Sequence, residues 1–216
     1  MDVFGLALLD YHEGNEAAIL QSHDDSGFQF ELPVSVFYRS WDFYEADRVA
    51  LERCKGKTLD IGAGAGMHTL ELQKRGIDVT ALDSSEKACT VLRNRGVAQV
   101  VHGNIQNYSS PEKFDTWLLL GRSIGLVSTI EGFREFLSKA ANGLSSNGRL
   151  IFNSVDVSVP SSRKMWFSYQ GMKGTELNWF DVNIETVGCE AANAGFNIQV
   201  LHLSDDGNYL VELTIA

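Results

Sequence analysis

Residues 58–66 read Thr-Leu-Asp-Ile-Gly-Ala-Gly-Ala-Gly, an apolar run that ends in glycines at alternate positions. A short apolar run followed directly by glycine is typical of a parallel strand that turns into a helix. The first turn of such a helix has free amide hydrogens and a partial positive charge, which a ligand reaches only where no Cβ blocks its approach. The stretch therefore predicts a ligand-binding turn in an α/β fold.

The spacing of these glycines bears on the kind of ligand. Dinucleotide-binding turns follow G-x-G-x-x-G, in which the third glycine lets the helix pack closely on the strand. Counted from Gly62, that pattern requires a small residue where the sequence has Met67. The glycines follow G-x-G-x-G instead, after an acidic residue, Asp60. A second acid, Asp83, stands 19 residues after Gly64. An acid at this distance is compatible with a dinucleotide-binding turn and equally with a turn of the G-x-G-x-G kind.

From about residue 56, short apolar runs alternate with amphipathic stretches, as in βα units around a parallel sheet. An S-x-x-E capping box at Ser128 and Glu131 predicts the start of the helix that follows the fourth strand. One predicted hairpin, within residues 18–32, precedes these βα units. A second, aromatic hairpin at 164–180 interrupts them. The predicted strands lie at 58–61, 79–82, 97–102, 114–121 and 149–157, with helices between them and at 182–194, and a final hairpin at 196–215.

These motifs together resemble those of the class I S-adenosylmethionine-dependent methyltransferases. "LDIGAGAG" at 59–66 resembles the first motif of that family, and Asp83 matches the position whose carboxylate accepts hydrogen bonds from the ribose hydroxyls. "HGNIQNY" at 102–108 resembles the adenine site, with Asn104 in place of the usual acid. "LLLGRSIG" at 118–125 resembles the motif that approaches the methionine part of the cofactor.

The resemblance covers residues 56–216 and implies a doubly wound α/β fold, in which a mostly parallel seven-stranded sheet has an antiparallel last strand. Residues 1–55 are then expected to form a cap segment without being an independent domain, and 56–216 the methyltransferase domain. The cofactor implied is S-adenosylmethionine, with S-adenosylhomocysteine as product. Its expected site is Asp60, Ile61, Gly62, Ala63, Gly64, Gly66, Asp83, Ser84, Asn104, Ile105, Leu120, Gly121 and Arg122.

A base helps methyl transfer when the acceptor is a hydroxyl or a protonated amine. His68 lies in the first turn after the glycines and is the candidate, although a packing or capping role is an equal alternative. Side chains from the cap segment, the loop after the fourth strand and the aromatic hairpin are candidates for the walls of the acceptor site. They are Tyr38, Arg39, Trp41, Ser123, Trp166 and Tyr169.

The composition narrows the range of acceptors. The net charge is −10, and residues 1–50 hold ten acidic residues against two arginines. A nucleic-acid binder needs a basic surface, so nucleic acid is not expected as a partner. The sequence after the fourth strand has neither the Asn/Asp-Pro-Pro-aromatic segment nor the Pro-Cys pair that base-methylating members of the family carry. A small-molecule acceptor is therefore predicted, although the accepting atom and the oligomeric state are not readable.

Metal binding and membrane insertion are not expected either. The three cysteines and five histidines are scattered, without the spacing of a metal site. No apolar run approaches the roughly 20 residues of a membrane span, and the first residues do not resemble a secretory signal. We therefore predict a cytoplasmic methyltransferase. Two alternatives remain open, a non-catalytic module that binds S-adenosylmethionine and an NAD-dependent oxidoreductase.

Overall fold

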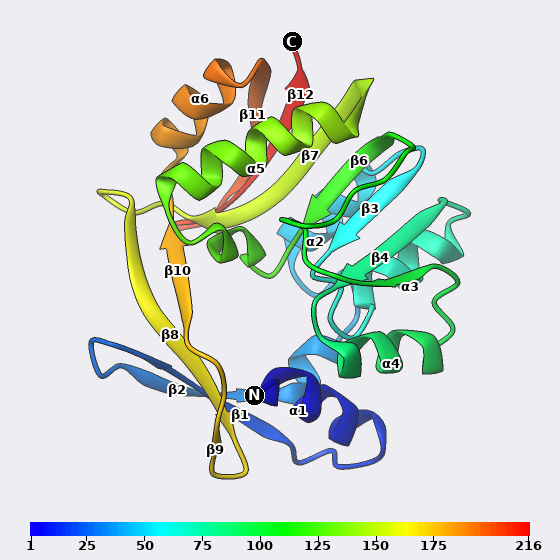
Figure 1. Ribbon diagram of the computed structural model, residues 1–216, viewed down its shortest axis with the longest axis vertical. Helices are drawn as coiled ribbons and strands as arrows, with labels where there is room; N and C mark the ends of the chain where they lie inside the picture. Colours follow the sequence, from blue (N-terminus) through cyan, green and yellow to red (C-terminus); the bar gives the residue numbers. More distant parts are fainter.

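The computed structural model describes all 216 residues and contains two β-sheets (Figure 1). The main sheet has seven strands in the order β11-β12-β7-β6-β3-β4-β5. The strands from β7 to β5 are parallel, whereas β12 runs antiparallel to both β7 and β11. Their bounds are β3 Thr58–Ile61, β4 Val79–Asp83, β5 Val100–His102, β6 Phe114–Leu119, β7 Leu144–Val155, β11 Phe196–Leu203 and β12 Asn208–Ile215. The predicted α/β fold with its antiparallel last strand is confirmed.

Helices cover both faces of this sheet, and the central strand β6 shows why. Trp117 and Leu119 belong to the apolar core under α5 (Ile130–Gly143) and α6 (Ile184–Asn193). Leu118 and Leu120 point the other way, into the core with α2 (Glu45–Arg53) and α3 (Met67–Lys74). A strand buried on both faces needs apolar side chains on both, which explains the apolar run from Trp117 to Leu120 at the end of β6. A further helix, α4 (Glu86–Asn94), follows β4 in the chain.

The start of α5 corrects one prediction. The N-cap is Thr129, whose side chain accepts from the Gly132 N–H, and not Ser128. Ser128 has a positive φ of 72° and belongs to the preceding turn. Strand β7 also begins at Leu144, earlier than the predicted residue 149, and its pairing with β6 is irregular between Leu144 and Arg149.

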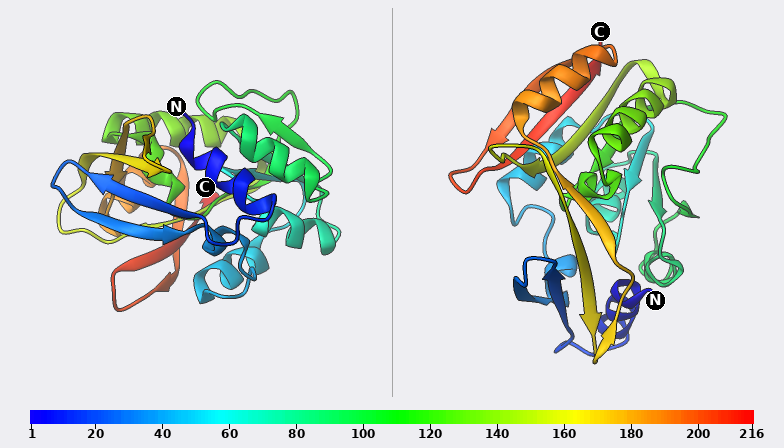
Figure 2. Two further views of the ribbon diagram at one scale, coloured as in Figure 1. Left: turned by 90° about the horizontal axis from the view of Figure 1, so that it is seen from below. Right: turned by 60° about the vertical axis from the view of Figure 1, so that its left-hand side comes forward.

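A second sheet lies over one end of the main sheet (Figures 1 and 2). We call it the cap sheet. Its strands β1 (Ile19–Asp24) and β2 (Gln29–Pro33) come from the predicted N-terminal hairpin. They pair through β1 with β8 (Ser161–Tyr169), which in turn pairs with β9 (Met172–Lys173) and β10 (Leu177–Asp181). The cap sheet thus joins two segments that are distant in sequence.

The first helix, α1 (Val3–His12), was not predicted. Asp2 caps it by accepting a hydrogen bond from the Gly5 N–H, and the helix packs against α4 and β8. Residues 1–55 also supply α2 to the core of the main sheet. The chain therefore reaches the core of the main sheet before residue 56. The boundary between a cap segment at 1–55 and a methyltransferase domain at 56–216 stays a prediction.

Candidate functional site

A cavity of about 670 Å³ lies between the carboxyl ends of the main-sheet strands and the cap sheet. The loops after β3, β4 and β6 form one wall, as expected for a ligand site in an open α/β sheet. The start of α1 and one face of the cap sheet form the other. Twelve of the predicted site residues line it: Asp60, Gly62, Ala63, Gly64, Asp83, Ser84, Leu120, Gly121, Arg122, Arg39, His68 and Ser123.

The glycine turn has a backbone that only glycine adopts readily. Gly62, Gly64 and Gly66 all have positive φ, at 75°, 55° and 82°. A Cβ built on Gly64 would meet nothing closer than a backbone oxygen at 4.0 Å, so the turn is open on that side. A Cβ on Gly66 would instead lie 2.7 Å from Leu92 of α4. The last glycine therefore serves helix packing, and the first two expose the backbone to the cavity.

Asp83 holds the glycine turn from the neighbouring strand. Its Oδ2 accepts from the Gly64 N–H at 2.8 Å, and its Oδ1 accepts from the Ser85 N–H at 2.9 Å. Burial raises the pKa of the Asp83 carboxyl, and these two backbone hydrogen bonds oppose that rise. Ser85 Oγ also donates to Asp2 at 2.6 Å, which ties the cap of α1 to this corner of the cavity.

Asp60 lies below the turn and is 2% exposed. Burial raises the pKa of its carboxyl, while the charge of His68 and a hydrogen bond from Thr69 lower it. The Thr69 hydroxyl donates to Asp60 Oδ2 at 2.5 Å. A carboxyl this buried is retained at a stability cost, which is common at functional sites.

His68 lines the cavity, but its Nε2 faces an ion pair. Its Nε2 lies 3.5 Å from Asp47 Oδ2, is buried, and has no hydrogen-bond partner. The same Asp47 oxygen accepts from Arg39 Nη2 at 2.6 Å, and the Arg39 guanidinium also lies over the Tyr44 ring. The cluster of Arg39, Asp47 and His68 therefore joins the N-terminal segment to the helix that follows the glycine turn. Sequence reasoning missed Asp47, since nothing in the motif points to it.

A second charged cluster links the main sheet to the cap. Arg122 follows β6 with a positive φ of 60°, and its backbone N–H donates to Asn153 Oδ1. Its Nη2 donates to Asp181 Oδ1 at 2.9 Å, and Arg163 of β8 bonds the other Asp181 oxygen. The Ser123 hydroxyl donates to the Leu120 carbonyl, which shapes the loop under this cluster.

The cavity face of the cap sheet follows from strand alternation. Ser22 pairs with both Phe30 and Phe167, which therefore point to the same face of the sheet, one on each side of Ser22. On the same face, Met165 pairs with Leu177, and Arg163 pairs with Trp179. The residues of this face line the cavity. These side chains are Phe30, Leu32, Arg163, Met165, Phe167, Leu177 and Trp179.

Alternation also explains why Trp166 does not line the cavity. It stands between Met165 and Phe167, so it points to the outer face, where it stacks on His23 and lies under Lys173. Tyr169 is buried in the core around α1, and its hydroxyl donates to Asp10.

The remaining predicted residues also lie outside the cavity. The Tyr38 hydroxyl donates to the Leu8 carbonyl, and burial raises the Tyr38 pKa to about 12. Trp41 lies under Arg75 and packs against the core with α2 and α3, Ile61 is buried in the core under α5 and α6, and Gly66 packs on α4. Asn104 is exposed and bonds the Gln106 N–H. Ile105 packs against the main core.

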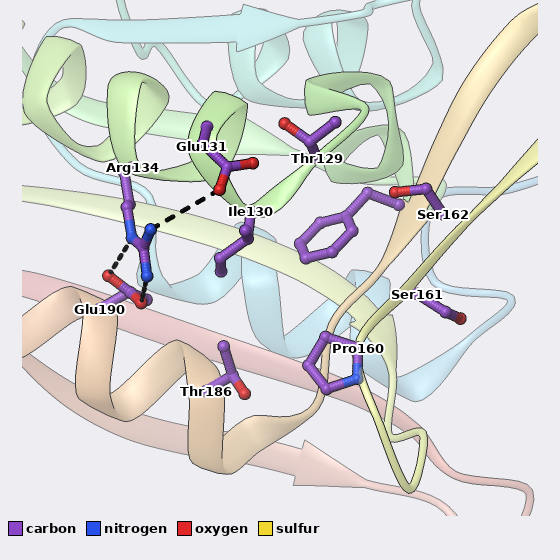
Figure 3. A pocket seen from close by; sticks show the side chains of 10 residues that line it. Thr129, Ile130, Glu131, Arg134, Pro160, Ser161, Ser162, Thr186 and Glu190 are labelled. Atoms are coloured by element: carbon purple, nitrogen blue, oxygen red, sulfur yellow. Dashed lines mark hydrogen bonds and ion pairs between the residues drawn. The ribbon is translucent and has the colours of Figure 1, made fainter.

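Other features of the surface do not form a comparable site. A shallower pocket of about 530 Å³ lies between α5, α6 and the start of β8 (Figure 3). Arg134 at its centre is paired bidentately with Glu190, so its charge is already balanced. No group of three or more His, Cys, Asp and Glu side chains is arranged to hold a metal ion. None of the helices has the length and apolar character needed to cross a membrane.

Comparison with known proteins relates this geometry to an enzyme family. The family model described as a methyltransferase domain matches residues 58–148. The crystal structure of an S-adenosylmethionine-dependent methyltransferase from Bacteroides fragilis, in complex with S-adenosylhomocysteine, is 26% identical. It superimposes with a TM-score of 0.92 over 100% of this chain and 95% of that one, so the match takes in the cap sheet as well.

Two further relatives are more distant. An S-adenosylmethionine-bound amino pentose methyltransferase from Micromonospora echinaspora shares the fold at 17% identity, with a TM-score of 0.58 over 80% of this chain and 89% of its own. The mitochondrial ubiquinone biosynthesis O-methyltransferase of Schizosaccharomyces pombe is 27% identical over 107 residues. That alignment covers 46% of this chain and spans only 38% of the length of the curated relative.

Proposed function

The chain is a class I S-adenosylmethionine-dependent methyltransferase, and we propose that its methyl acceptor is a small molecule bound under the cap sheet. The observation that carries this proposal is the single cavity in which the glycine turn and Asp83 face the cap sheet. A cavity closed on two sides suits a small acceptor better than a polymer. The O-methyltransferase named in the comparison points the same way.

The residues of the main-sheet wall fit the cofactor. Gly62 and Gly64 leave the backbone open, and the Asp83 carboxylate lies beside them at the end of the next strand. We infer that Asp83 accepts hydrogen bonds from the ribose hydroxyls, and that Leu120, Gly121 and Arg122 approach the methionine part. Asn104 and Ile105 follow β5, the neighbour of β4, and are proposed for the adenine end. When bound, S-adenosylmethionine supplies a methyl group that its sulfonium already activates.

The protein then has to hold the acceptor in line with that methyl group and exclude water. Positioning of two reactants supplies up to about 7 to 11 kcal/mol, so a catalytic side chain is not required. The cap sheet provides the positioning surface through Met165, Phe167 and Trp179. The acceptor forms its bond to the methyl carbon as the carbon–sulfur bond breaks, and the bonding electrons stay on sulfur.

His68 is better placed to position the site than to act as a base. Its Nε2 is buried against Asp47, so it does not reach an acceptor in the cavity. We infer that the Arg39–Asp47–His68 cluster fixes the N-terminal segment beside the glycine turn. A His68→Gln variant keeps a hydrogen-bonding side chain of similar length and is expected to retain the pH profile of methyl transfer.

The test of the proposed function separates it from its alternatives. Isothermal titration should show binding of S-adenosylhomocysteine and none of NAD. Incubation with methyl-labelled S-adenosylmethionine and a fractionated metabolite extract should place label in the small-molecule fraction. Binding of cofactor with no labelled product would favour a non-catalytic module, and label in protein or nucleic acid would contradict the small-molecule acceptor. The cytoplasmic location and the absence of a metal requirement stay predictions.

A further inference from the structure

Two arginines at the cap end of the cavity share one buried carboxylate. The Asp181 side chain is 4% exposed, whereas the side chains of Arg122 and Arg163 are 35% and 37% exposed and line the cavity. Each arginine bonds a different Asp181 oxygen, so both oxygens are engaged. The buried carboxylate therefore holds both guanidinium groups in place, and the guanidinium groups reach the cavity in front of it.

These guanidinium groups keep donors that the protein does not use. A guanidinium has several N–H groups, of which Asp181 engages one on each arginine. Arg122 Nε is buried without any partner. Asp24 is the other acid within reach, but its Oδ2 lies 3.9 Å from Arg163 Nε, too far for a hydrogen bond. Its Oδ1 is engaged in its own turn with Ser26 and Phe28.

The cavity that the arginine pair lines also carries exposed apolar side chains. Phe28, Phe30 and Leu126 line the cavity and are 62%, 46% and 41% exposed. Large apolar side chains that stay exposed around a cavity mark a surface that binds an apolar ligand. Trp179, which pairs with Arg163 across β8 and β10, adds a broad aromatic side chain beside the charged groups.

We propose that the methyl acceptor is an aromatic or similarly flat apolar molecule that carries a carboxylate, and that Arg163 and Arg122 bind this carboxylate. Arginine matches the planar, two-oxygen geometry of a carboxylate better than other side chains do. Asp181 and, at 3.9 Å, Asp24 balance the charge of the pair, but each guanidinium keeps N–H groups that neither acid engages in a hydrogen bond, and a ligand carboxylate can accept from them. This inference rests on the proposed function, because it concerns the acceptor of the same site.

The test uses a matched pair of probes, trans-cinnamate and trans-cinnamamide, which share a body and differ in the charged group. Their dissociation constants are measured by isothermal titration on the full chain saturated with S-adenosylhomocysteine. We expect cinnamate to bind at least about tenfold more tightly than cinnamamide, the ratio that corresponds to about 1.4 kcal/mol. Equal affinity for the two probes, or binding of neither, overturns the proposal.

Variants locate the effect at the arginine pair. Arg163→Gln should lower cinnamate affinity to that of cinnamamide, and Arg163→Lys should lose part of the preference because a point charge replaces the fork. Asp181 keeps Arg122 as a partner in both variants, which protects the fold. Arg134→Gln, on α5 outside the cavity, is the control and should change neither affinity. A cinnamate preference that survives Arg163→Gln contradicts the assignment.

Failure of the proposed function has a different signature. If the wild-type chain does not bind S-adenosylhomocysteine, the cofactor assignment fails whatever the probes do. In that case the preference for cinnamate in the cofactor-free chain, and its loss in Arg163→Gln, still decide whether the arginine pair binds a carboxylate.

Discussion

The two walls of the cavity are built in different ways. The main-sheet wall consists of short loops directly after β3, β4 and β6. The loops after β3 and β6 contain glycines with positive φ, and Asp83 at the end of β4 accepts from Gly64 and Ser85. The cap wall exists only after distant segments pair: His23 and Ser168, which contact each other across β1 and β8, are 145 residues apart. The wall proposed for the cofactor is therefore encoded locally in this chain, whereas the wall proposed for the acceptor depends on long-range packing.

The variant expected to have the largest effect on the main-sheet wall is Gly66→Ala. The new Cβ would lie 2.7 Å from Leu92, at a residue with φ of 82°. Strain from a left-handed backbone costs about 1–2 kcal/mol and overpacking about 1–3 kcal/mol, so we expect the free energy of unfolding in urea to fall by roughly 2–5 kcal/mol. Gly76→Ala is the matched control, because Gly76 has a similar φ of 79° and open space around it. Equal losses in the two variants would refute the packing role of Gly66.

The next largest effect is expected for Asp83→Ala, which removes the carboxylate from the same wall. Affinity for S-adenosylhomocysteine should fall by more than about tenfold, or about 1.4 kcal/mol, because both the ribose partner and the bond to Gly64 are lost. Isothermal titration gives the affinity. Asp78→Ala, at an exposed carboxyl before β4, should leave it unchanged. An unaltered affinity in the Asp83 variant would remove the ribose assignment.

The difference between the locally built main-sheet wall and the cap wall explains how much of the site could be predicted from the sequence. The glycine turn, the acid Asp83 and the loop with Arg122 were found because strand-to-helix turns place their residues at fixed offsets in the chain. The same βα repeats predicted the parallel strands of the main sheet, although not their order. Even here, the motif could not separate the role of Gly66 in packing from that of Gly62 and Gly64 in exposing the backbone.

The cap wall could not be derived in this way. The hairpins were predicted, but which face of β8 meets the cavity depends on register with β1 and β10. A choice of Trp166 over its neighbours Met165 and Phe167 was therefore arbitrary in sequence terms. Tyr169 has the inward parity but lies beyond the cavity, in the core under α1. The partners Asp47 and Asp181 were missed because only tertiary contact brings them to His68, Arg122 and Arg163.

A pair of tryptophan variants sharpens the comparison on the cap side. Trp179→Leu removes an aromatic surface from the cavity and should weaken cinnamate binding about three- to tenfold, consistent with about 0.5–1.5 kcal/mol for an aromatic contact. Trp166→Leu changes the same strand system on its outer face and should leave the probe affinity as it is. The measurement is titration in the presence of S-adenosylhomocysteine. A larger effect of Trp166→Leu would show that the faces of β8 have been assigned the wrong way round.

The smallest effect concerns the stability cost of the main-sheet wall. Burial raises the pKa of Asp60 above its ordinary value of 3.8. Its ionised form is therefore disfavoured in the folded state, and the chain loses stability as pH rises from that value through the folded pKa. Asp60→Asn still accepts from Thr69 but does not ionise, so its unfolding free energy relative to wild type should rise between pH 3.5 and 7.5.

Asp115 provides the control of opposite sign. Hydrogen bonds from Ser145 and Lys57 lower the pKa of Asp115 below 3.8, so its contribution to stability is present above that pH and is lost as pH falls through the folded pKa. Asp115→Asn should then lose stability relative to wild type as pH rises through the lowered folded pKa to just above 3.8, and should show no further change at higher pH. Urea unfolding at several pH values gives both slopes. If the unfolding free energies of the two variants, relative to wild type, changed with pH in the same direction, the ionisation of buried Asp60 would not be what destabilises the main-sheet wall.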